Sequence, residues 1–402
     1  MAKRVRCIEG GVTAAKGFAA GGISAGIKSG GGSDVGIVFS EKKCVAAGTF
    51  TTNKIRASCV EWCSSHLPSA AVRAVVCNSG CANACTGRKG EKDTAELAES
   101  VAGELAVDKD GILVASTGVI GAYLPMNKIK AVLPVLRSHL SENGGTAFAE
   151  AIMTTDLVKK ECAVSVKSGR DSYVVGGSAK GSGMICPNMA TMLGFITTDA
   201  AISKTKLEPI IKRVVNRTFN NLTVDGDTST NDMVLVLANG MSGVKVADAN
   251  ASALFEEALY EVCNDLCSRI AADGEGATKR VEITVKGAVT EEDARLAAKA
   301  IANSNLTKCA LFGNDPNWGR IACAVGYSGA RFSDQKMSIK LCGIPVFKNV
   351  QPVQFDEKNI HDELKKKVVA IDVNLGLGIA SAVAHTCDFS YDYVKINAEY
   401  HT

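Results

Sequence analysis

The 402-residue sequence has no run of 18 uninterrupted apolar residues, about the shortest that crosses a bilayer as a helix. Its basic N-terminus, MAKRVRCIEGG, is not followed by the apolar segment of a secretory signal, so we expect a soluble, unexported protein. The net charge is only +3 and aromatic residues make up 5% of the chain, so the basic, aromatic-rich surface of a nucleic-acid-binding protein is not indicated. We expect neither a membrane nor a nucleic acid as a partner.

Several common catalytic and ligand-binding motifs are also missing. The sequence contains neither the G-x-S-x-G of serine hydrolases nor the H-E-x-x-H of zinc proteases. The segment GGSAKGSGM, residues 176–184, has glycines and a lysine but not the spacing of a phosphate-binding loop. Residues 225–236 begin like a calcium loop but lack its sixth-position glycine and twelfth-position glutamate, which favours an Asx-rich turn before a strand.

Cysteine, by contrast, is abundant, with 15 residues. In a long chain without a secretory signal we expect reduced, mostly buried thiols rather than a disulfide scaffold. Three groups recur at four-residue spacing, which places each group on one face if the segment is helical: Cys59 and Cys63; Cys77, Cys81 and Cys85; and Cys263 and Cys267. Because this is not the Cys-x-x-Cys spacing of zinc ribbons, we predict no metal site.

The apolar pattern predicts an α/β fold. Short β-like runs, including RAVVCNSG at 73–80 and GILVAST at 111–117, alternate with helical patterns such as 206–222 and 253–272. A chain of this length exceeds the usual size of a single core, so we expect two large subdomains. The 39 glycines cluster in turns, which predicts close backbone approaches.

One hydroxyl, that of Thr191, lies inside the otherwise apolar run Met-Ala-Thr-Met-Leu. Thr191 is either a strand residue satisfied by a neighbour or a nucleophile, and no histidine between His139 and His361 marks a local base. Attack of the hydroxyl on the Ala190 carbonyl, followed by hydrolysis of the ester, would cut the chain and supply an α-amino group as the base. Pro187 would stiffen the strained turn that this reaction needs.

A second candidate is LVASTGVIG, residues 113–121, where an apolar run ends in a hydroxyl followed by glycine. Backbone N–H and hydroxyl donors exposed at a strand end are suited to stabilising a tetrahedral oxyanion. An ordinary strand-to-helix turn has the same pattern, so these residues alone leave both interpretations open.

Eight segments together resemble the ornithine acetyltransferase/glutamate N-acetyltransferase family. In chain order they are GGVTAAKGF at Gly10, STGVIG at Ser116, AIMTTD at Ala151, KGSGMICPNMATML at Lys180, DTSTND at Asp227, DGEGATK at Asp273, GNDPNWGRI at Gly313 and NAEYHT at Asn397. The resemblance implies a self-cleaving enzyme of arginine biosynthesis. It also implies an N-terminal-nucleophile-like α/β fold, with sheets covered by helices and a smaller C-terminal α/β subdomain.

Cleavage between Ala190 and Thr191 is implied to give two chains. The alpha chain, 1–190, would hold the oxyanion hole and part of the pocket, and the beta chain, 191–402, would begin with the nucleophile and close the pocket. The first piece has a net charge of +6 and the second of −3, signs that suit two associated pieces. The resemblance further implies a heterotetramer of two alpha and two beta chains.

By motif position, Thr191 would be the nucleophile, and Thr117 and Gly118 would form the oxyanion hole. Substrate contacts are implied for Thr154, Lys180, Thr191, Glu275, Asn397 and Thr402. We expect Lys180 and Glu275 to hold the charged amino-acid part of the substrate, because charges aimed at the acetyl carbonyl would compete with the chemistry.

Each of these residues, taken singly, could have a structural role instead of a role in substrate binding. Lys180 could be a solvated loop lysine, Glu275 an N-cap acid near a helix start, Thr154 a cap, and the C-terminus frayed. Cys186, beside the predicted cleavage turn, is interpreted as a small packing residue because nothing in the sequence supplies a base for it.

The implied reaction is a ping-pong transfer in which Thr191 takes acetyl from N2-acetyl-L-ornithine, releases L-ornithine and passes the acetyl group to L-glutamate. Acetyl-CoA is a second donor in some members, and no metal or organic cofactor is implied. Two alternatives remain: a self-processing aminopeptidase or amidohydrolase whose acyl-enzyme is resolved by water, and a non-catalytic amino-acid-binding protein. Because only nine residues precede the first matching segment, we expect a cytoplasmic protein, or an organellar one if the source is eukaryotic and the numbering begins after processing.

Overall fold

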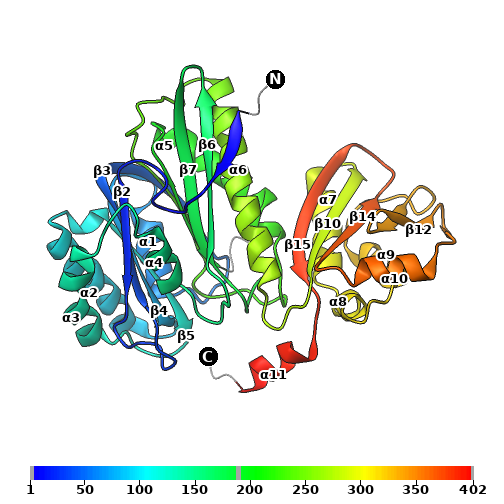
Figure 1. Cartoon of the computed structure of the whole chain (residues 1–402), viewed down its shortest axis with the longest axis horizontal. Coiled ribbons are helices and arrows are strands. Elements are labelled where there is room, and N and C mark those ends of the chain that lie inside the picture. Colours follow the sequence, from blue (N-terminus) through cyan, green and yellow to red (C-terminus); the bar gives the residue numbers. More distant parts are fainter. Residues whose placement is uncertain (1–3, 187–191, 400–402) are drawn as a thin grey trace.

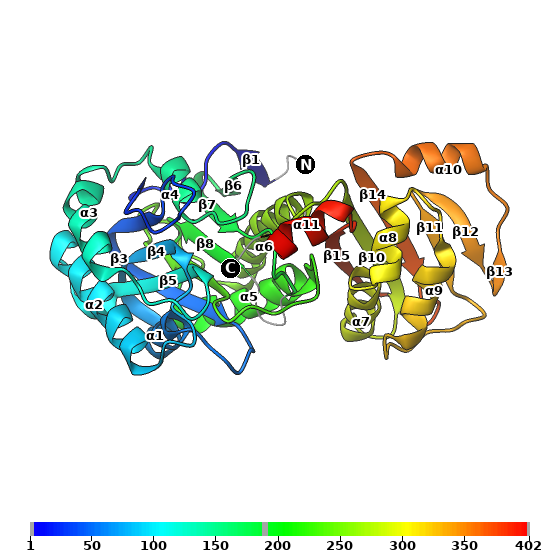
Figure 2. The same ribbon diagram turned by 90° about the horizontal axis from the view of Figure 1, so that it is seen from below.

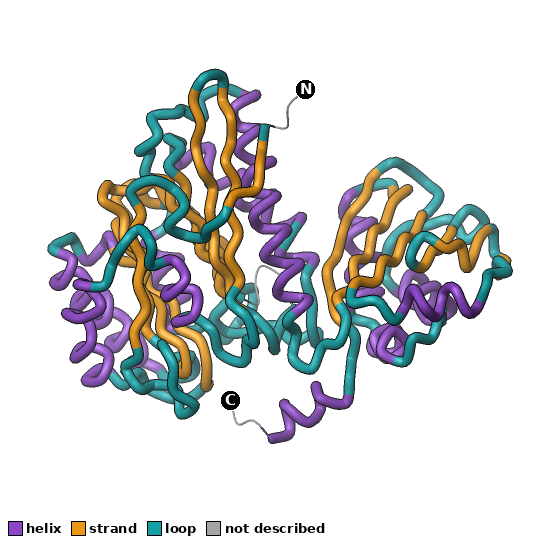
Figure 3. Tube along the Cα trace, in the orientation of Figure 1, coloured by secondary structure: helices purple, strands orange, loops and turns teal. Residues whose placement is uncertain are grey.

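The computed structural model describes residues 4–186 and 192–399. They form a large lobe on a nine-stranded sheet and a smaller C-terminal lobe on a six-stranded sheet, which lie side by side (Figure 1). Helices line the sheets of both lobes (Figure 3). The predicted α/β class and the smaller C-terminal α/β subdomain are therefore confirmed.

The large sheet mixes strands from before and after the predicted cleavage point. Its order is β1 (Val5–Ile8), β6 (Lys160–Ser168), β7 (Asp171–Lys180), β8 (Leu193–Thr198), β9 (Met233–Ala238), β3 (Val35–Phe50), β4 (Ser69–Cys81) and β5 (Ile112–Val119), and β2 (Phe18–Ile23) also pairs with β3. The 16-residue strand β3 pairs with β2 through residues 35–40, with β4 through residues between 35 and 46, and with β9 through residues 45–50. Since β8 and β9 lie in the middle, the pieces 1–190 and 191–402 share one sheet.

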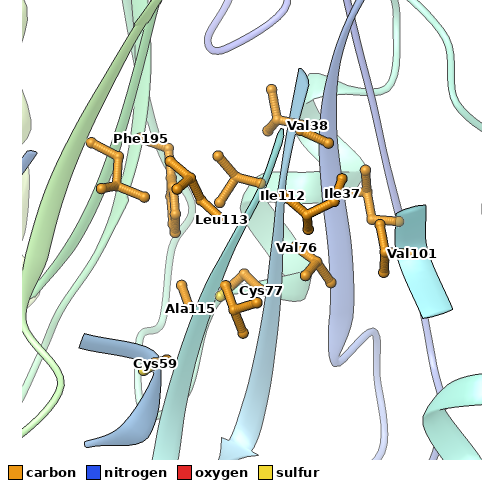
Figure 4. Close-up of a cluster of buried hydrophobic side chains, with 14 of the residues drawn as sticks. Ile37, Val38, Cys59, Val76, Cys77, Val101, Ile112, Leu113, Ala115 and Phe195 are labelled. Carbon is orange, nitrogen blue, oxygen red and sulfur yellow. The ribbon is translucent and has the colours of Figure 1, made fainter. Parts of the chain in front are cut away.

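Helices cover this sheet around two clusters of buried apolar side chains. The helices are α1 (Ser58–His66), α2 (Gly87–Leu105), α3 (Met126–Ser138), α4 (Gly145–Ala151), α5 (Lys204–Arg217) and α6 (Ala249–Ala272), with single 3-10 turns at Lys109–Gly111 and Phe219–Asn221. In the first cluster, side chains of β3, β4 and β5 pack together, among them Val38, Val76 and Leu113 (Figure 4). In the second cluster, side chains of β6, β7, β8 and β9 pack against those of α5 and α6.

The smaller lobe has its own buried core. Its strands run in the order β13 (Gln351–Pro352), β12 (Ile344–Lys348), β11 (Ser338–Leu341), β14 (Val368–Asn374), β10 (Arg280–Ala288) and β15 (Ala380–Cys387), and its helices are α7 (Glu291–Ala302), α8 (Asn305–Phe312), α9 (Trp318–Tyr327) and α10 (Glu357–Leu364). After β15, helix α11 (Tyr391–Glu399) runs back beneath the large lobe (Figures 1 and 2). Helix α11 thereby lies beside the lobe that contains Thr117 and Lys180.

The cysteines match the expected chemistry, and the pairs Cys59 and Cys63 and Cys263 and Cys267 lie in helices, as the shared-face interpretation requires. All fifteen are free and nine are buried, as predicted. Burial raises the pKa of the Cys59 thiol to about 11, which suits a packing role. Cys77 and Cys81, however, lie in strand β4, so their four-residue spacing does not put them on one helix face. Across residues 4–186 and 192–399, no helix combines the length and the apolar character needed to span a bilayer.

Candidate active site

A cavity of about 810 Å³, its open mouth included, lies where strands β5 and β7 end. Six of the predicted site residues line it: Thr117, Gly118, Thr154, Lys180, Glu275 and Asn397. Ala190, Thr191 and Thr402 lie outside the described residues, but Met192 and Leu193 belong to the cavity wall. The structure thus brings together residues that are more than 270 positions apart in the chain.

Thr117 and Gly118 lie at the end of β5, beside the end of the parallel strand β4. The pairing register shifts here, and Gly118 has a φ of +127°. A Cβ atom on Gly118 would lie 2.4 Å from the carbonyl carbon of Gly80 and 2.6 Å from the backbone nitrogen of Cys81. Glycine is therefore required at 118 by both backbone conformation and space.

Lys180 is the last residue of β7 and only 8% exposed, so it is not a solvated loop lysine. Its Nζ donates a hydrogen bond of 3.3 Å to Oγ1 of Thr117. Because the Thr117 oxygen accepts this bond, its own O–H remains able to donate to a ligand. The Lys180 ammonium therefore lies beside a predicted oxyanion donor, although we expected it to hold the charged amino-acid part of the substrate and not to approach the acetyl carbonyl.

Glu275 and Asn397 form another part of the cavity wall. Glu275 is 8% exposed, and its Oε2 accepts a hydrogen bond of 2.9 Å from Nδ2 of Asn397 in α11. A Cβ atom on Gly183 would lie 2.3 Å from the Glu275 carboxylate, so glycine leaves the space that this carboxylate fills. Glu275 lies in a turn after α6 rather than at a helix start, so the N-cap alternative is wrong.

Thr154 lies beyond the C-cap of α4, so it does not cap that helix. Its backbone N–H donates to Oδ2 of Asp156 at 3.0 Å. Asp156 is completely buried as a side chain beside Lys160. Burial alone would raise the pKa of Asp156, but the charges of Lys160 and Lys180 outweigh it and lower the pKa to about 2. Asp156 is therefore an anion directly behind the cavity.

The residues on both sides of 187–191 are held by the segment 223–233. The Asp225 carboxylate accepts hydrogen bonds from the backbone N–H groups of Met184 and Ile185, at 2.7 and 2.9 Å. Burial raises the pKa of Asp225. The Thr228 hydroxyl donates to the Cys186 carbonyl, and Cys186 is buried. On the other side, the Met233 N–H donates to the Met192 carbonyl at 3.1 Å.

Sequence reasoning missed part of the cavity wall. Ser229, Thr230, Asn231 and Asp232 line it, although their segment was interpreted only as a turn before a strand. That interpretation is correct, because β9 begins at Met233, but it is incomplete. Nδ2 of Asn231 donates to the carbonyls of Ala82 and Ser116, at 2.7 and 2.8 Å, and so ties the turn to the end of β5. The inclusion of DTSTND among the eight matching segments was the available signal.

Within the part of the chain that the structure describes, no group of three or more histidine, cysteine, aspartate or glutamate side chains is placed to hold a metal ion. The cavity instead offers one lysine, Lys180, two carboxyl groups, those of Asp232 and Glu275, hydroxyl groups and an apolar wall that includes Ile120 and Met192. Such a lining suits a zwitterionic amino acid with a small acyl group.

The ArgJ family model matches residues 19–402, nearly the whole sequence. The chain therefore belongs to the ArgJ family. The arginine biosynthesis bifunctional protein ArgJ of Thermosynechococcus vestitus is 46% identical over 98% of this chain and 99% of its own length. The chloroplastic ArgJ protein of Sorghum bicolor is also 46% identical, over 98% of this chain and 88% of its own.

Among solved structures, the chain resembles the arginine biosynthesis bifunctional protein argJ from Bacillus halodurans, with 45% identity and a TM-score of 0.51. This match covers 52% of the present chain and 100% of the solved one. The resemblance found in the sequence and the N-terminal-nucleophile-like α/β fold it implies are thereby confirmed. The chain is an enzyme of arginine biosynthesis that transfers acetyl groups.

Proposed function

We propose that this cavity transfers acetyl from N2-acetyl-L-ornithine to L-glutamate through an acetyl ester on Thr191, giving L-ornithine and N-acetyl-L-glutamate. The observation that carries the proposal is the meeting of Thr117, Gly118, Lys180 and Glu275 in one cavity, whose wall includes the residue that follows Thr191. Donors for an oxyanion and opposite charges for an amino acid are thus present together.

We propose that Thr191 becomes available by cleavage of the Ala190–Thr191 bond. The segment 191–402 would make up 212 of the 402 residues, or 53% of the chain. This length agrees with the solved argJ chain, all of which matches 52% of the present chain. The shared large sheet supports continued association of the chains 1–190 and 191–402, because their strands alternate across it.

In the proposed mechanism the new α-amino group of Thr191 accepts the proton of its own hydroxyl while the oxygen attacks the acetyl carbonyl. The Thr117 hydroxyl and the Gly118 N–H donate to the oxyanion of the tetrahedral intermediate. Expulsion of ornithine, which takes the proton from the α-ammonium group, leaves the acetyl ester. The amino group of glutamate then attacks the ester carbonyl and regenerates the Thr191 hydroxyl.

The remaining predicted residues would bind the substrate. Lys180 would pair with the α-carboxylate common to both substrates, and its place beside Thr117 suits this role because that carboxylate and the acetylated nitrogen are bonded to the same carbon. Glu275 would hold an ammonium group. Thr154, Asn397 and Thr402 would complete the contacts. The Asn397 amide, which already donates to Glu275, would orient that carboxylate.

Three wider features belong to the same proposal. The word "bifunctional" in the names of the relatives supports acetyl-CoA as a second acetyl donor. We also propose a heterotetramer of two alpha and two beta chains. The cytoplasm is the proposed location, with an organelle as the alternative, since one relative is named as chloroplastic.

The test is an assay of purified protein with N-acetylornithine, with and without glutamate. Acetyl transfer predicts ornithine release that depends on glutamate and an equal amount of N-acetylglutamate. Release of acetate at the same rate without glutamate would instead identify an amidohydrolase. Absence of turnover together with an uncut chain on a denaturing gel would favour a binding protein.

A further inference from the structure

Three charged side chains, Asp156, Lys160 and Asp273, form a buried ion network behind the cavity. Nζ of Lys160 donates to Oδ1 of Asp156 and to Oδ2 of Asp273, at 2.6 Å in each case. The side chains of Lys160 and Asp156 have no exposed surface, and that of Asp273 is 5% exposed. Burying charges is costly, and apolar side chains of similar volume often stabilise a fold at least as well. The network therefore points to a role beyond stability.

Asp156 links this network to two segments that line the cavity. Its Oδ1 accepts a hydrogen bond of 2.7 Å from the backbone N–H of Gly181, the residue after Lys180. Its Oδ2 accepts one of 3.0 Å from the N–H of Thr154. A single carboxylate thus fixes the backbone at two of the proposed substrate contacts, which come from separate parts of the chain.

Asp273 links the same network to the wall that holds Glu275. Its Oδ2 also accepts from the N–H of Leu157 at 3.0 Å, and its carbonyl accepts from the Ser182 hydroxyl at 2.6 Å. The Ser182 carbonyl in turn accepts from the N–H of Glu275 at 3.0 Å. The cationic and anionic walls are therefore joined through one buried lysine, Lys160.

The network also has an electrostatic consequence for the cavity. Two carboxylates and one ammonium carry a net charge of −1, and the charge of Lys180 interacts favourably with Asp156. An ammonium group in a largely buried site needs such a compensating charge. Without the negative charge of Asp156, the Lys180 ammonium would be less stable at the cavity wall beside Thr117.

We propose that Asp156, fixed by Lys160 and Asp273, is a positioning residue for acetyl transfer that acts through Lys180. It touches no substrate atom. It sets the backbone position of Lys180 and Thr154 and supplies the charge that keeps the Lys180 ammonium at the cavity wall. This inference rests on the proposed function only in assigning Lys180 a role in that reaction.

The test is a double-mutant cycle with Asp156→Asn, Lys180→Met and the double variant. Asp156→Asn keeps the shape of the side chain and removes its charge. For each variant, kcat and KM are measured for acetyl transfer on protein confirmed as cleaved, and glutamate and ornithine binding are measured by calorimetry, which needs no turnover. The matched control is Asp293→Asn, because Asp293 is a buried aspartate paired with Arg331 in the smaller lobe.

We expect Asp156→Asn to change the same parameter as Lys180→Met, in the same direction, by about tenfold, since charge-assisted contacts are worth roughly 1.5–3 kcal/mol. The double variant should fall short of the product of the two single effects by at least about threefold, as expected of residues that act together. Asp293→Asn should leave both parameters unchanged even if it lowers the melting temperature. The proposal would be overturned if the effects of the two single substitutions multiply in the double variant. It would also be overturned if Asp156→Asn changes a parameter that Lys180→Met leaves unchanged.

If Asp156→Asn does not give folded protein, the same cycle is run with Asp273→Asn and Glu275→Gln, for which we also expect non-multiplying effects. If neither aspartate variant folds, the network is a stability element and the inference is wrong. Ligand binding by the unsubstituted protein without acetyl transfer would contradict the proposed function, while the calorimetric cycle would still decide the role of Asp156.

Discussion

Replacing Thr117 with alanine separates transition-state stabilisation from substrate binding. Removal of one oxyanion donor typically lowers kcat by about 10² to 10³, or roughly 3–4 kcal/mol. Among residues 4–186 and 192–399, the hydrogen bond that the Thr117 hydroxyl makes in the ground state is the 3.3 Å bond from Lys180, which is long for a charge-assisted bond and should be worth about 1 kcal/mol or less. We therefore expect kcat to fall at least about a hundredfold while KM changes by less than about fivefold.

The assay is steady-state acetyl transfer with both substrates varied, on Thr117→Ala protein confirmed as cleaved. Thr117→Ser is the matched control, because it retains the hydroxyl and should keep kcat within about tenfold of the unsubstituted enzyme. Thr117 is half-buried, so its truncation should cost little stability. A rise in KM at unchanged kcat, or a serine variant as impaired as the alanine variant, would show that this hydroxyl is not an oxyanion donor.

Three further substitutions test other parts of the account. Lys180→Met should raise KM for N-acetylornithine and glutamate together by roughly ten- to a hundredfold, since both present an α-carboxylate, and loss of acylation rate alone would instead make Lys180 part of the catalytic apparatus. Gly118→Ala should lower the melting temperature far more than Gly121→Ala, because both have positive φ but only Gly118 has backbone within 3 Å of the new Cβ; equal shifts in thermal unfolding would contradict this. Burial and a neighbouring arginine lower the pKa of His385 to about 4. Just below pH 6.5, the His385 imidazole is therefore protonated in the unfolded chain but still neutral in the folded one. Stability should accordingly fall by about 2 kcal/mol through this group between pH 7 and pH 5, and urea unfolding of His385→Gln should lack that fall.

Local patterns in the sequence were sufficient for many of the elements. The run at 73–80 lies in β4, the run at 111–117 lies in β5 except for its first residue, and the helical patterns at 206–222 and 253–272 fall largely in α5 and α6. In these segments the apolar period and the tertiary environment agree. Strand β3 was not predicted, because the polar residues 40–43 interrupt its apolar pattern and its two parts pair with different neighbours.

The site was predictable only where a motif marked it. Six predicted residues line the cavity because the matching segments carry them, but no local signal distinguishes Lys160 from the neighbouring lysine at 159. Lys160 is fully buried, and its partner Asp273 is 113 positions away. Burial of a charge depends on contacts between distant segments, which neither periodicity nor composition records.

The central claim is most directly tested by mass spectrometry of the purified protein after incubation with N-acetylornithine and no glutamate. We expect two chains, one of which begins Thr-Met-Leu at Thr191 and is heavier by one acetyl group. Hydroxylamine should remove this acetyl group, and glutamate should accept it. Thr191→Ala should remain a single uncut, unacetylated chain. A cut at another bond, acetyl on another residue, or a label that resists hydroxylamine would contradict an acetyl ester on the Thr191 hydroxyl.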